Sequence, residues 1–244
     1  MIRLFAVSTL LTALAVLPAQ AGCGDRAKPG VDWSGCEKKL IVISGSDLTG
    51  ARLTDANLTS TDISGSKLVD AVLDGANVTY TSLRGADLSN VSMHKTFGVR
   101  TNFAGAKVTD ADLGYAEFYR PNFEGADLTG TDLSRAGLPR SNFKGAVLVN
   151  ANMAKSDAIR ADFTGANLSG ADLSYAIVAR ATFDGATLAG SNWEGAYLYR
   201  AELSGIDLSG VKGLTTQQVA LACGDGGTQL PMGVEAPAQW FCED

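Results

Sequence analysis

The stretch FYRPNFEGADLTG, residues 118–130, decides the fold of this chain of 244 residues. Its apolar side chains recur at every fifth residue, at Phe118, Phe123 and Leu128. An α-helix buries residues three or four apart, and a strand with one buried face buries every second residue. A period of five fits neither element, so the stretch predicts a short structural unit that is repeated along the chain.

The same unit continues in unbroken register from residue 46 to residue 210, as 33 pentapeptides of the form small–polar–apolar–polar–any, here numbered positions 1 to 5. Position 3 is Leu in 18 of them, Phe in six and another large apolar residue in seven; only Gly98 and Ala158 interrupt it. This pattern resembles that of the pentapeptide-repeat family. The resemblance implies an all-β fold, a right-handed quadrilateral parallel β-helix of about eight coils with one pentapeptide on each side.

A second period, of 20 residues, sorts the position 3 residues into four columns. Position 5 after the fourth column is Gly in every coil from Gly45 to Gly205, which predicts either a turn with positive φ or a very close approach of backbones there. Position 5 after the first column is Gly, Asn or Asp throughout, with the same preference. The fourth column predicts a buried aromatic ladder rather than a cofactor site, and its phenylalanines are Phe103, Phe123, Phe143, Phe163 and Phe183.

Residues 1–21 have the features of a secretory signal peptide: Arg3, an apolar run over 4–17 and the small-x-small sequence Ala-Gln-Ala at 19–21. We therefore expect a periplasmic or secreted protein. A lipid on Cys23 is the rival interpretation, which is disfavoured because Gln stands where a lipoprotein signal prefers Leu. The apolar run is too short to span a membrane and no other stretch could do so, so no transmembrane segment is expected.

The four cysteines form two close pairs at the two ends of the mature chain, Cys23 with Cys36 and Cys223 with Cys242. An even-numbered, locally paired set in an exported chain predicts two disulfides. Zinc is the alternative use, but the chain has no Cys-x-x-Cys and a single histidine.

The two ends of a stacked coil need caps, because their backbone polar groups are otherwise unpaired. We assign residues 22–45 to an N-terminal cap, 46–210 to the repeats and 211–244 to a C-terminal cap. A capping box over Thr215–Gln218 predicts one short helix. The tail is similar to those of bacterial pentapeptide-repeat proteins, which implies a cap. A dimer contact through it is the alternative, so the protein is expected to be a monomer or a dimer.

The sequence contains no arrangement typical of an enzyme. Its single histidine, His94, lies beside Lys95 in the least regular coil and is more typical of a solvated loop than of a catalytic base. No Gly-rich phosphate loop leads from a strand into a helix. The many Asp and Asn residues at position 2 suit turns and local hydrogen bonds. We predict a non-enzymatic protein with no catalytic residue, metal site or cofactor.

One side of the predicted rod collects arginines and tyrosines. We define this Arg/Tyr side as the six-residue windows 55–60, 75–80 and onward to 195–200; its net charge is +6, against −13 for the rest of the mature chain. The opposite, acidic side, the windows 45–50 to 205–210, carries −4. All six tyrosines lie on the Arg/Tyr side, and six successive coils place Arg at its position 5. The candidate partner-binding residues are Arg100, Arg120, Arg140, Arg160, Arg180, Arg200, Tyr115, Tyr119, Tyr175, Tyr197 and Tyr199.

Three functions compete. The first is an exported binding or scaffold module whose Arg/Tyr side contacts an unidentified protein or an anionic polymer or surface, such as a polysaccharide or lipid headgroups. The second, implied by the family resemblance, is a DNA-mimicking rod that protects a topoisomerase (gyrase) from quinolones. The export signal and the basic stripe argue against it, and no nucleic-acid partner is expected. The third is a purely structural repeat protein in which the column of six arginines from Arg100 to Arg200, here called the Arg ladder, binds no ligand.

We predict that the mature chain begins at Gly22 and contains the disulfides Cys23–Cys36 and Cys223–Cys242, because the chain is exported and its cysteines are paired locally. Reduction adds two hydrogens for each disulfide, so intact masses before and after reduction count the bonds. An unchanged mass, or the added mass of a lipid on Cys23, would contradict the prediction.

Overall fold

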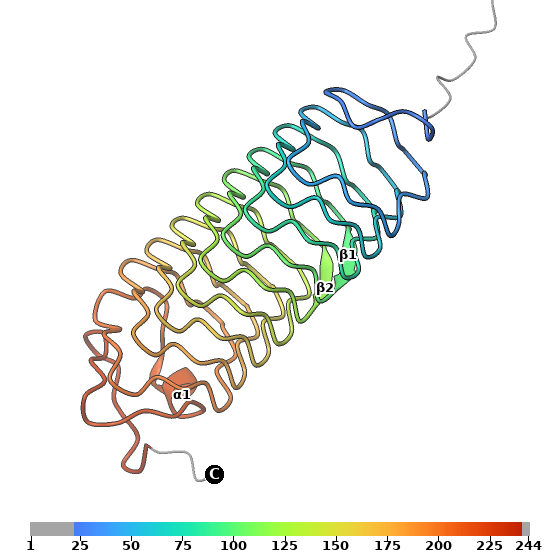
Figure 1. The fold of residues 1–244 in the computed structure, drawn as a ribbon. Coiled ribbons are helices and arrows are strands. Elements are labelled where there is room, and N and C mark those ends of the chain that lie inside the picture. The colour runs from blue at the N-terminus through green and yellow to red at the C-terminus, as the bar shows by residue number, and fades with distance from the viewer. Residues whose placement is uncertain (1–21, 241–244) are drawn as a thin grey trace, which may run out of the picture.

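The computed structural model describes residues 22–240, which form a straight rod of stacked coils with the two termini at opposite ends (Figure 1). Parallel β-bridges join residues 20 positions apart along almost the whole rod, from Asp32–Arg52 to Asn192–Lys212. Because successive bridge residues are five positions apart, four pentapeptides complete one coil. The parallel coil with a 20-residue period is therefore confirmed.

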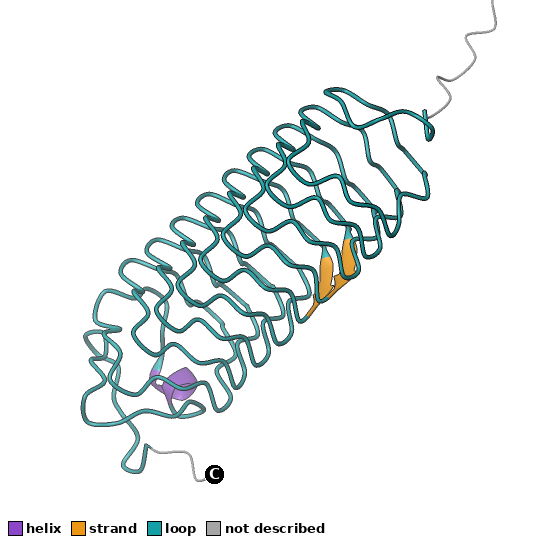
Figure 2. Ribbon diagram, viewed as in Figure 1, coloured by secondary structure: helices purple, strands orange, loops and turns teal. Residues whose placement is uncertain are grey.

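Regular secondary structure is sparse in the described residues, since each side of the coil is only one pentapeptide long. Strands β1, Phe97–Val99, and β2, Glu117–Tyr119, pair in parallel on the Arg/Tyr side. One helix, α1, Thr216–Val219, lies near the C-terminal end (Figure 2). Elsewhere the sides of the coil meet through single bridge residues.

Backbone hydrogen bonds between coils hold the stack together. The amide at position 2 donates to the preceding coil, as Arg52 N does to Val31 O at 2.9 Å. The amides at positions 3 and 5 donate to the following coil, as Leu53 N does to Val72 O at 2.7 Å. The amide at position 1 closes the turn by donating to the residue three before it. Four of the five amides in a pentapeptide therefore have backbone partners, as buried backbone N–H groups require.

The fifth amide, at position 4, takes its partner from a side chain wherever position 2 is Asp or Asn. Asn57 Oδ1 accepts from Thr59 N at 3.1 Å, and Asp62 Oδ1 accepts from Ser64 N at 2.9 Å. The hydrogen bonds from the side chain and the amide of Ser64 lower the pKa of Asp62. This pattern explains the preference for Asp and Asn at position 2, because both residues bring an acceptor within reach of the amide two residues later.

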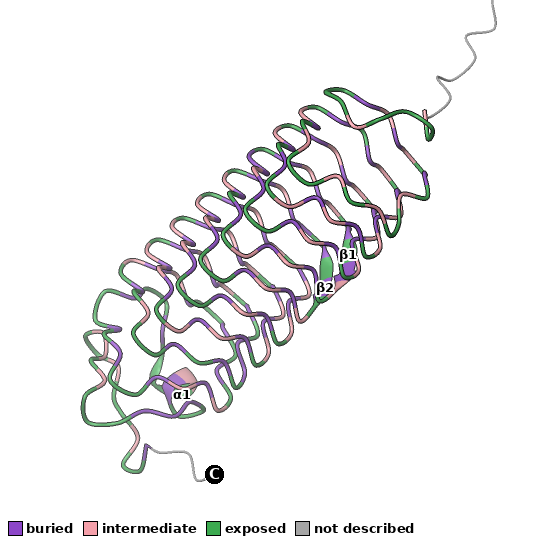
Figure 3. Ribbon diagram, viewed as in Figure 1, coloured by how far each residue is buried: buried purple, intermediate pink, exposed green. Residues whose placement is uncertain are grey.

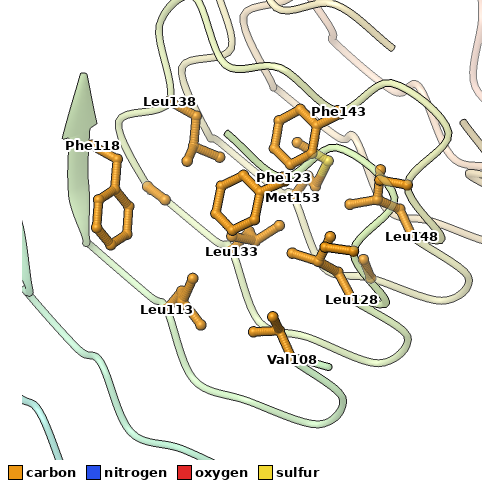
Figure 4. Close-up of a cluster of buried hydrophobic side chains, with 14 of the residues drawn as sticks. Val108, Leu113, Phe118, Phe123, Leu128, Leu133, Leu138, Phe143, Leu148 and Met153 are labelled. Carbon is orange, nitrogen blue, oxygen red and sulfur yellow. The ribbon is translucent and has the colours of Figure 1, made fainter. Parts of the chain in front are cut away.

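Buried residues recur on every coil along the rod (Figure 3), and the inward side chains of all four columns form one continuous core, part of which Figure 4 shows. The phenylalanine ladder predicted for the fourth column is confirmed: the ring of Phe123 lies 4.6 Å from that of Phe103 and 5.0 Å from that of Phe143, nearly parallel to both. Phe183 ends the ladder against Trp193, at 5.3 Å. Every large apolar residue at position 3, from Leu48 to Leu208, is almost entirely buried.

Small residues are needed at position 1 because it is also buried. Where it is Thr, the hydroxyl donates to a carbonyl of the preceding coil: Thr81 Oγ1 lies 2.7 Å from Leu58 O, and Thr101 Oγ1 lies 2.9 Å from Val78 O. These bonds satisfy a buried hydroxyl that would otherwise destabilise the core.

Position 5 has positive φ at all four corners of the coil, not only at the glycine corners. Gly45 to Gly205 after the fourth column adopt this conformation, as predicted. The six arginines after the third column share it, with φ between 52° and 59°. Their identity therefore does not come from the turn, because a residue with a Cβ is disfavoured in this region.

The interruption of the repeat at Gly98 makes room for the next coil. A Cβ at Gly98 would clash with Thr101 Oγ1 and would lie 3.0 Å from Val78 Cγ2 and 3.3 Å from the ring of Phe118. Phe118 instead fills the space, with its ring edge-on to Phe103 at 5.5 Å. A large residue in one coil thus compensates for the missing side chain in the coil before it.

The coil begins earlier in the chain than the assigned start of the repeats at residue 46. Bridges already involve Asp32, Glu37 and Val42, and Trp33 is buried at an inward position. The segment assigned to the N-terminal cap, 22–45, therefore contributes the first turns of the rod. In this segment Lys38 stands at position 3 in place of an apolar residue, and its Nζ lies 3.9 Å from the centre of the Trp33 ring.

The structure contains the disulfide Cys23–Cys36, with Cα atoms 5.5 Å apart, which ties residues 22–30 to the first coil. Cys223 is buried, but Cys242 lies outside the described residues, as does the signal-peptide segment 1–21. The second disulfide and the export signal stay predictions.

At the C-terminal end, α1 begins at the predicted capping box, in which Thr215 and Gln218 hydrogen-bond to each other's backbone amides. The Gln218 side chain also donates to Trp193 O at 2.8 Å and to Ala196 O at 2.9 Å. The inserted turn shifts the pairing from 20 residues to 21 at Glu202–Cys223. The helix thus lies against the carbonyls that the last full coil exposes.

We predict that Phe123→Ala lowers the free energy of unfolding by about 3–5 kcal/mol, because it leaves a cavity in the middle of the ladder. Glu124→Ala is the control: its side chain is exposed, so the change should stay within about 0.5 kcal/mol. Denaturant unfolding followed by circular dichroism measures both. Equal losses in the two variants would mean that position 3 is not the inward position.

Candidate binding surface

The Arg/Tyr side is built on a conformation that does not favour its residues. A left-handed corner costs a residue with a Cβ roughly 1–2 kcal/mol, whereas Gly adopts it freely. Two corners of the coil use mainly Gly, Asn or Asp. On the Arg/Tyr side, arginine occupies the corner in six successive coils, from Arg100 to Arg200. Turn chemistry alone would not select this ladder.

Most arginines of the ladder have no hydrogen-bond or ion-pair partner in the part of the chain that the structure describes. Within residues 22–240, the guanidinium groups of Arg100, Arg140, Arg160 and Arg180 make no hydrogen bond and no ion pair, and all four residues are exposed. Arg120 lies over the ring of Tyr119, with Cζ 5.3 Å from the ring centre. These cations are therefore available to a partner, while their mutual repulsion is not relieved by neighbouring carboxylates.

The tyrosines at the predicted positions lie on this same surface and are about half exposed. The rings of Tyr197 and Tyr199 stack at 6.3 Å. The hydroxyl of Tyr175 donates to Glu194 Oε1 at 3.0 Å, and this bond to a carboxylate raises the pKa of Tyr175. On the neighbouring corner, Arg135 lies over the ring of Tyr115 at 5.4 Å. The geometry brings the predicted residues together; their role as partner contacts is a prediction.

Sequence reasoning missed two members of this surface, Phe97 and Ile177. Both occupy position 2, and 44% and 38% of their surfaces are exposed. The sequence did contain a signal for their exposure. Position 2 points outward throughout the repeat and is usually polar, so a large apolar residue there stands out. A large apolar residue there exposes apolar surface, and it also gives up the Asp or Asn acceptor that elsewhere satisfies the position 4 amide.

The acidic side has a different local role. Its aspartates Asp47, Asp87, Asp127 and Asp207 each accept a hydrogen bond from the amide two residues later. The Ser209 hydroxyl also donates to Asp207 at 2.6 Å, and these bonds hold the pKa of Asp207 below its usual value. The negative charge of this side follows from turn chemistry, whereas the positive charge of the Arg/Tyr side does not.

Within the described residues, no group of three or more His, Cys, Asp or Glu side chains could hold a metal ion, and no helix is long and apolar enough to cross a membrane. His94 is not a free loop residue. Its Nδ1 lies 3.7 Å from Asp112 Oδ2, and its ring meets Tyr115 edge-on at 5.3 Å.

The family model described as Pentapeptide repeats (8 copies) matches residues 42–75, 66–97, 99–135, 140–177 and 179–212. The chain belongs to the pentapeptide-repeat family. Proteins of this family adopt a right-handed β-helix and are generally non-enzymatic structural or binding proteins. Among curated proteins, no sequence gives a significant match.

Solved structures of pentapeptide repeat proteins are similar to this chain. HetL, involved in heterocyst differentiation regulation in the cyanobacterium Nostoc sp. strain PCC 7120, is 25% identical, with 73% of this chain and 92% of HetL covered and a TM-score of 0.34. QnrB1, a plasmid-mediated fluoroquinolone resistance protein, is 19% identical, with 76% and 95% covered and a TM-score of 0.45. A thylakoid lumen protein of Arabidopsis thaliana is 26% identical, with 41% and 67% covered and a TM-score of 0.25. The family assignment rests on the repeats themselves.

We predict that Arg140→Gly leaves the free energy of unfolding unchanged or raises it by up to about 1 kcal/mol. The substitution relieves the left-handed corner and the charge repulsion, while the greater freedom of Gly in the unfolded chain offsets part of the gain. Lys107→Gly is the matched control: Lys107 is an exposed cation outside the positive-φ corners, so this change should destabilise by about 0.5–1 kcal/mol. A loss above about 1 kcal/mol for Arg140→Gly in denaturant unfolding would show that the ladder is structural.

Proposed function

We propose that this protein is an exported, non-enzymatic binding or scaffold module whose Arg/Tyr side engages an anionic partner. One observation carries the proposal: arginines occupy left-handed corners in successive coils although most of them lack any carboxylate or hydrogen-bond partner in residues 22–240. In each of these coils, the left-handed backbone conformation and the repulsion between neighbouring cations both destabilise the folded rod. A partner that supplies negative charge would offset this destabilisation, which gives a physical reason for the arginines at these corners.

The chemistry of the surface defines the partner. Guanidinium groups bind carboxylate, phosphate or sulfate through two parallel hydrogen bonds, and tyrosines add rigid contact area. Coils spaced about 4.8 Å apart repeat these contacts along the rod. The proposed partner is therefore extended and anionic, whether a polymer, a surface or an acidic face of a protein.

The gyrase-protection alternative uses the opposite part of the molecule. It requires a continuous acidic surface that imitates DNA, and the unpaired cations of the Arg/Tyr side interrupt such a surface along most of the rod. The export signal predicted for residues 1–21 also places the chain away from the cytoplasm, where gyrase acts.

The remaining assignments belong to the same proposal. About eight coils form the binding rod, and residues 211–240 with α1 cap its C-terminal end, supported by the bonds from Gln218 to the last full coil. Removal of the signal peptide leaves a monomer, or a dimer that pairs through this cap.

We predict that neutralising the ladder lowers affinity for heparin, a soluble polyanion used as the probe, by at least about tenfold, and that wild-type affinity falls with salt. Binding is measured by isothermal titration calorimetry at low and high salt. The test variant converts Arg120, Arg140, Arg160 and Arg180 to Gln.

Two controls accompany it. The first makes the same change in net charge on other sides of the rod, by converting the exposed cations Lys67, Arg84, Lys107 and Lys144 to Gln. The second converts the acidic-side residues Asp47, Asp87, Asp127 and Asp207 to Asn, which retains their Oδ1 acceptors. Heparin affinity unchanged in the ladder variant, or lowered equally in the first control, contradicts the proposal.

A further inference from the structure

Exposed apolar side chains are distributed unevenly over the rod. Of the 12 large hydrophobic residues that are exposed in residues 22–240, Val42 and Met232 lie off the Arg/Tyr side, while Leu40 and Leu221 continue the register of this side toward the two ends of the rod. All the others lie on the Arg/Tyr side, and they are Tyr80, Phe97, Tyr115, Tyr119, Tyr175, Ile177, Tyr197 and Tyr199. Along the body of the rod, the most basic side is therefore also the side with the large exposed apolar residues.

The apolar residues lie between two rows of cations. Phe97, Ile177 and Tyr197 are bridge residues on the flat of this side, hydrogen-bonded into the coil through Asn77–Phe97, Asp157–Ile177 and Ile177–Tyr197. The Arg ladder follows them at one corner. Lys95, Arg135 and Lys155 precede this side at the other corner, and all three are exposed. The result is an apolar strip, interrupted at position 2 by Glu117, Gly137 and Asp157, with cations along both edges.

We propose that the anionic partner of this strip is the surface of an anionic phospholipid bilayer, on which the rod lies along its Arg/Tyr side; this inference rests on the proposed function. Soluble polyanions are hydrated and need only the cations. Phe97 and Ile177 gain nothing from a hydrated chain, but they leave water when they enter the boundary between headgroups and acyl chains. Tyrosine is enriched at that boundary, because its ring is apolar and its hydroxyl remains hydrated.

The positions of the cations agree with a planar partner. Both rows flank one side of a straight rod, so a plane contacts both rows at once, whereas a single extended chain follows one row. Long Arg and Lys side chains at the edges reach phosphate groups while the strip between them is buried. The acidic side, on the opposite face, is repelled by the same surface and orients the rod with its Arg/Tyr side toward the lipid.

The contact is peripheral. The large side chains on the strip come from single bridge residues and corners of a rigid coil, so only their outward atoms can enter the lipid. The described part of the chain has no helix that could cross a bilayer. The rod is therefore expected to bind reversibly, with contributions from both charge and apolar contact.

The test uses the mature chain and two kinds of vesicle, phosphatidylcholine alone and phosphatidylcholine with phosphatidylglycerol, in a co-sedimentation assay. The apolar variant, Phe97→Ser with Ile177→Ser and Tyr197→Ser, removes the strip and keeps every cation. Its control, Val42→Ser with Met232→Ser, removes two exposed apolar residues that lie off the Arg/Tyr side. Thermal unfolding confirms that each variant is folded, and heparin affinity is measured in parallel.

We expect the wild type and the control to bind the phosphatidylglycerol vesicles and not those of phosphatidylcholine alone. The apolar variant should lose at least about tenfold in vesicle affinity while its heparin affinity changes less than about twofold. Wild-type binding to heparin without binding to vesicles overturns this inference and leaves the proposed function standing, with a soluble polyanion as the partner. Vesicle binding by the apolar variant equal to that of the wild type also overturns it. Binding to neither probe contradicts both proposals.

Discussion

The structure depends on one constraint: the backbone amides that face neighbouring coils must find partners when only one large side chain per five-residue side enters the core. Hydrogen bonds to the coils before and after satisfy positions 2, 3 and 5, and the turn satisfies position 1. Where position 2 is Asp or Asn, its side chain satisfies position 4. One buried Leu contributes roughly 1.5–3 kcal/mol, less than the entropy lost by ordering five residues. A side is therefore stable only within the stack, and the repeat pattern follows from this requirement.

The same constraint determines where function can be placed. Positions 1 and 3 are buried, so only positions 2, 4 and 5 can vary in response to a partner. On the acidic side these positions still serve the turn, as Asp207 shows by binding the amide and hydroxyl of Ser209. On the Arg/Tyr side, these positions do not follow the preferences of the turn. Arginine stands at the left-handed corner in place of glycine, and Phe97 and Ile177 stand at position 2 in place of the Asp or Asn acceptor. Departure from local preference, more than residue type alone, distinguishes this side.

A rigid rod with charge of opposite sign on opposite faces has a defined orientation toward any extended anionic partner. The straight stack keeps the arginines in line, because each corner is fixed by hydrogen bonds to the coils on either side of it. Such a surface is preorganised, so little conformational entropy is lost when a partner binds. A flexible chain with the same composition would have to order its cations at the moment of binding.

Much of the fold and the membership of the candidate surface followed from the sequence, because they depend on periodicity. The spacing of five predicted the inward residues, the spacing of 20 predicted the phenylalanine ladder, and the same arithmetic gathered Arg100 to Arg200 on one side. A period can be read without coordinates, since each residue 20 positions later lies in the same place one coil further on.

Tertiary structure alone decided what depends on distances between coils. It showed that the arginine corners share the left-handed conformation of the glycine corners, and that the coil already includes Trp33. It showed how Phe118 fills the space left at Gly98. It also showed that most guanidinium groups of the ladder lack a partner in the described residues, while Phe97 and Ile177 are exposed beside them. The sequence specifies which residue occupies each position of the coil. The exposure and the contacts of that residue depend on the neighbouring coils, whose side chains are 20 residues away along the chain but only about 4.8 Å away in space.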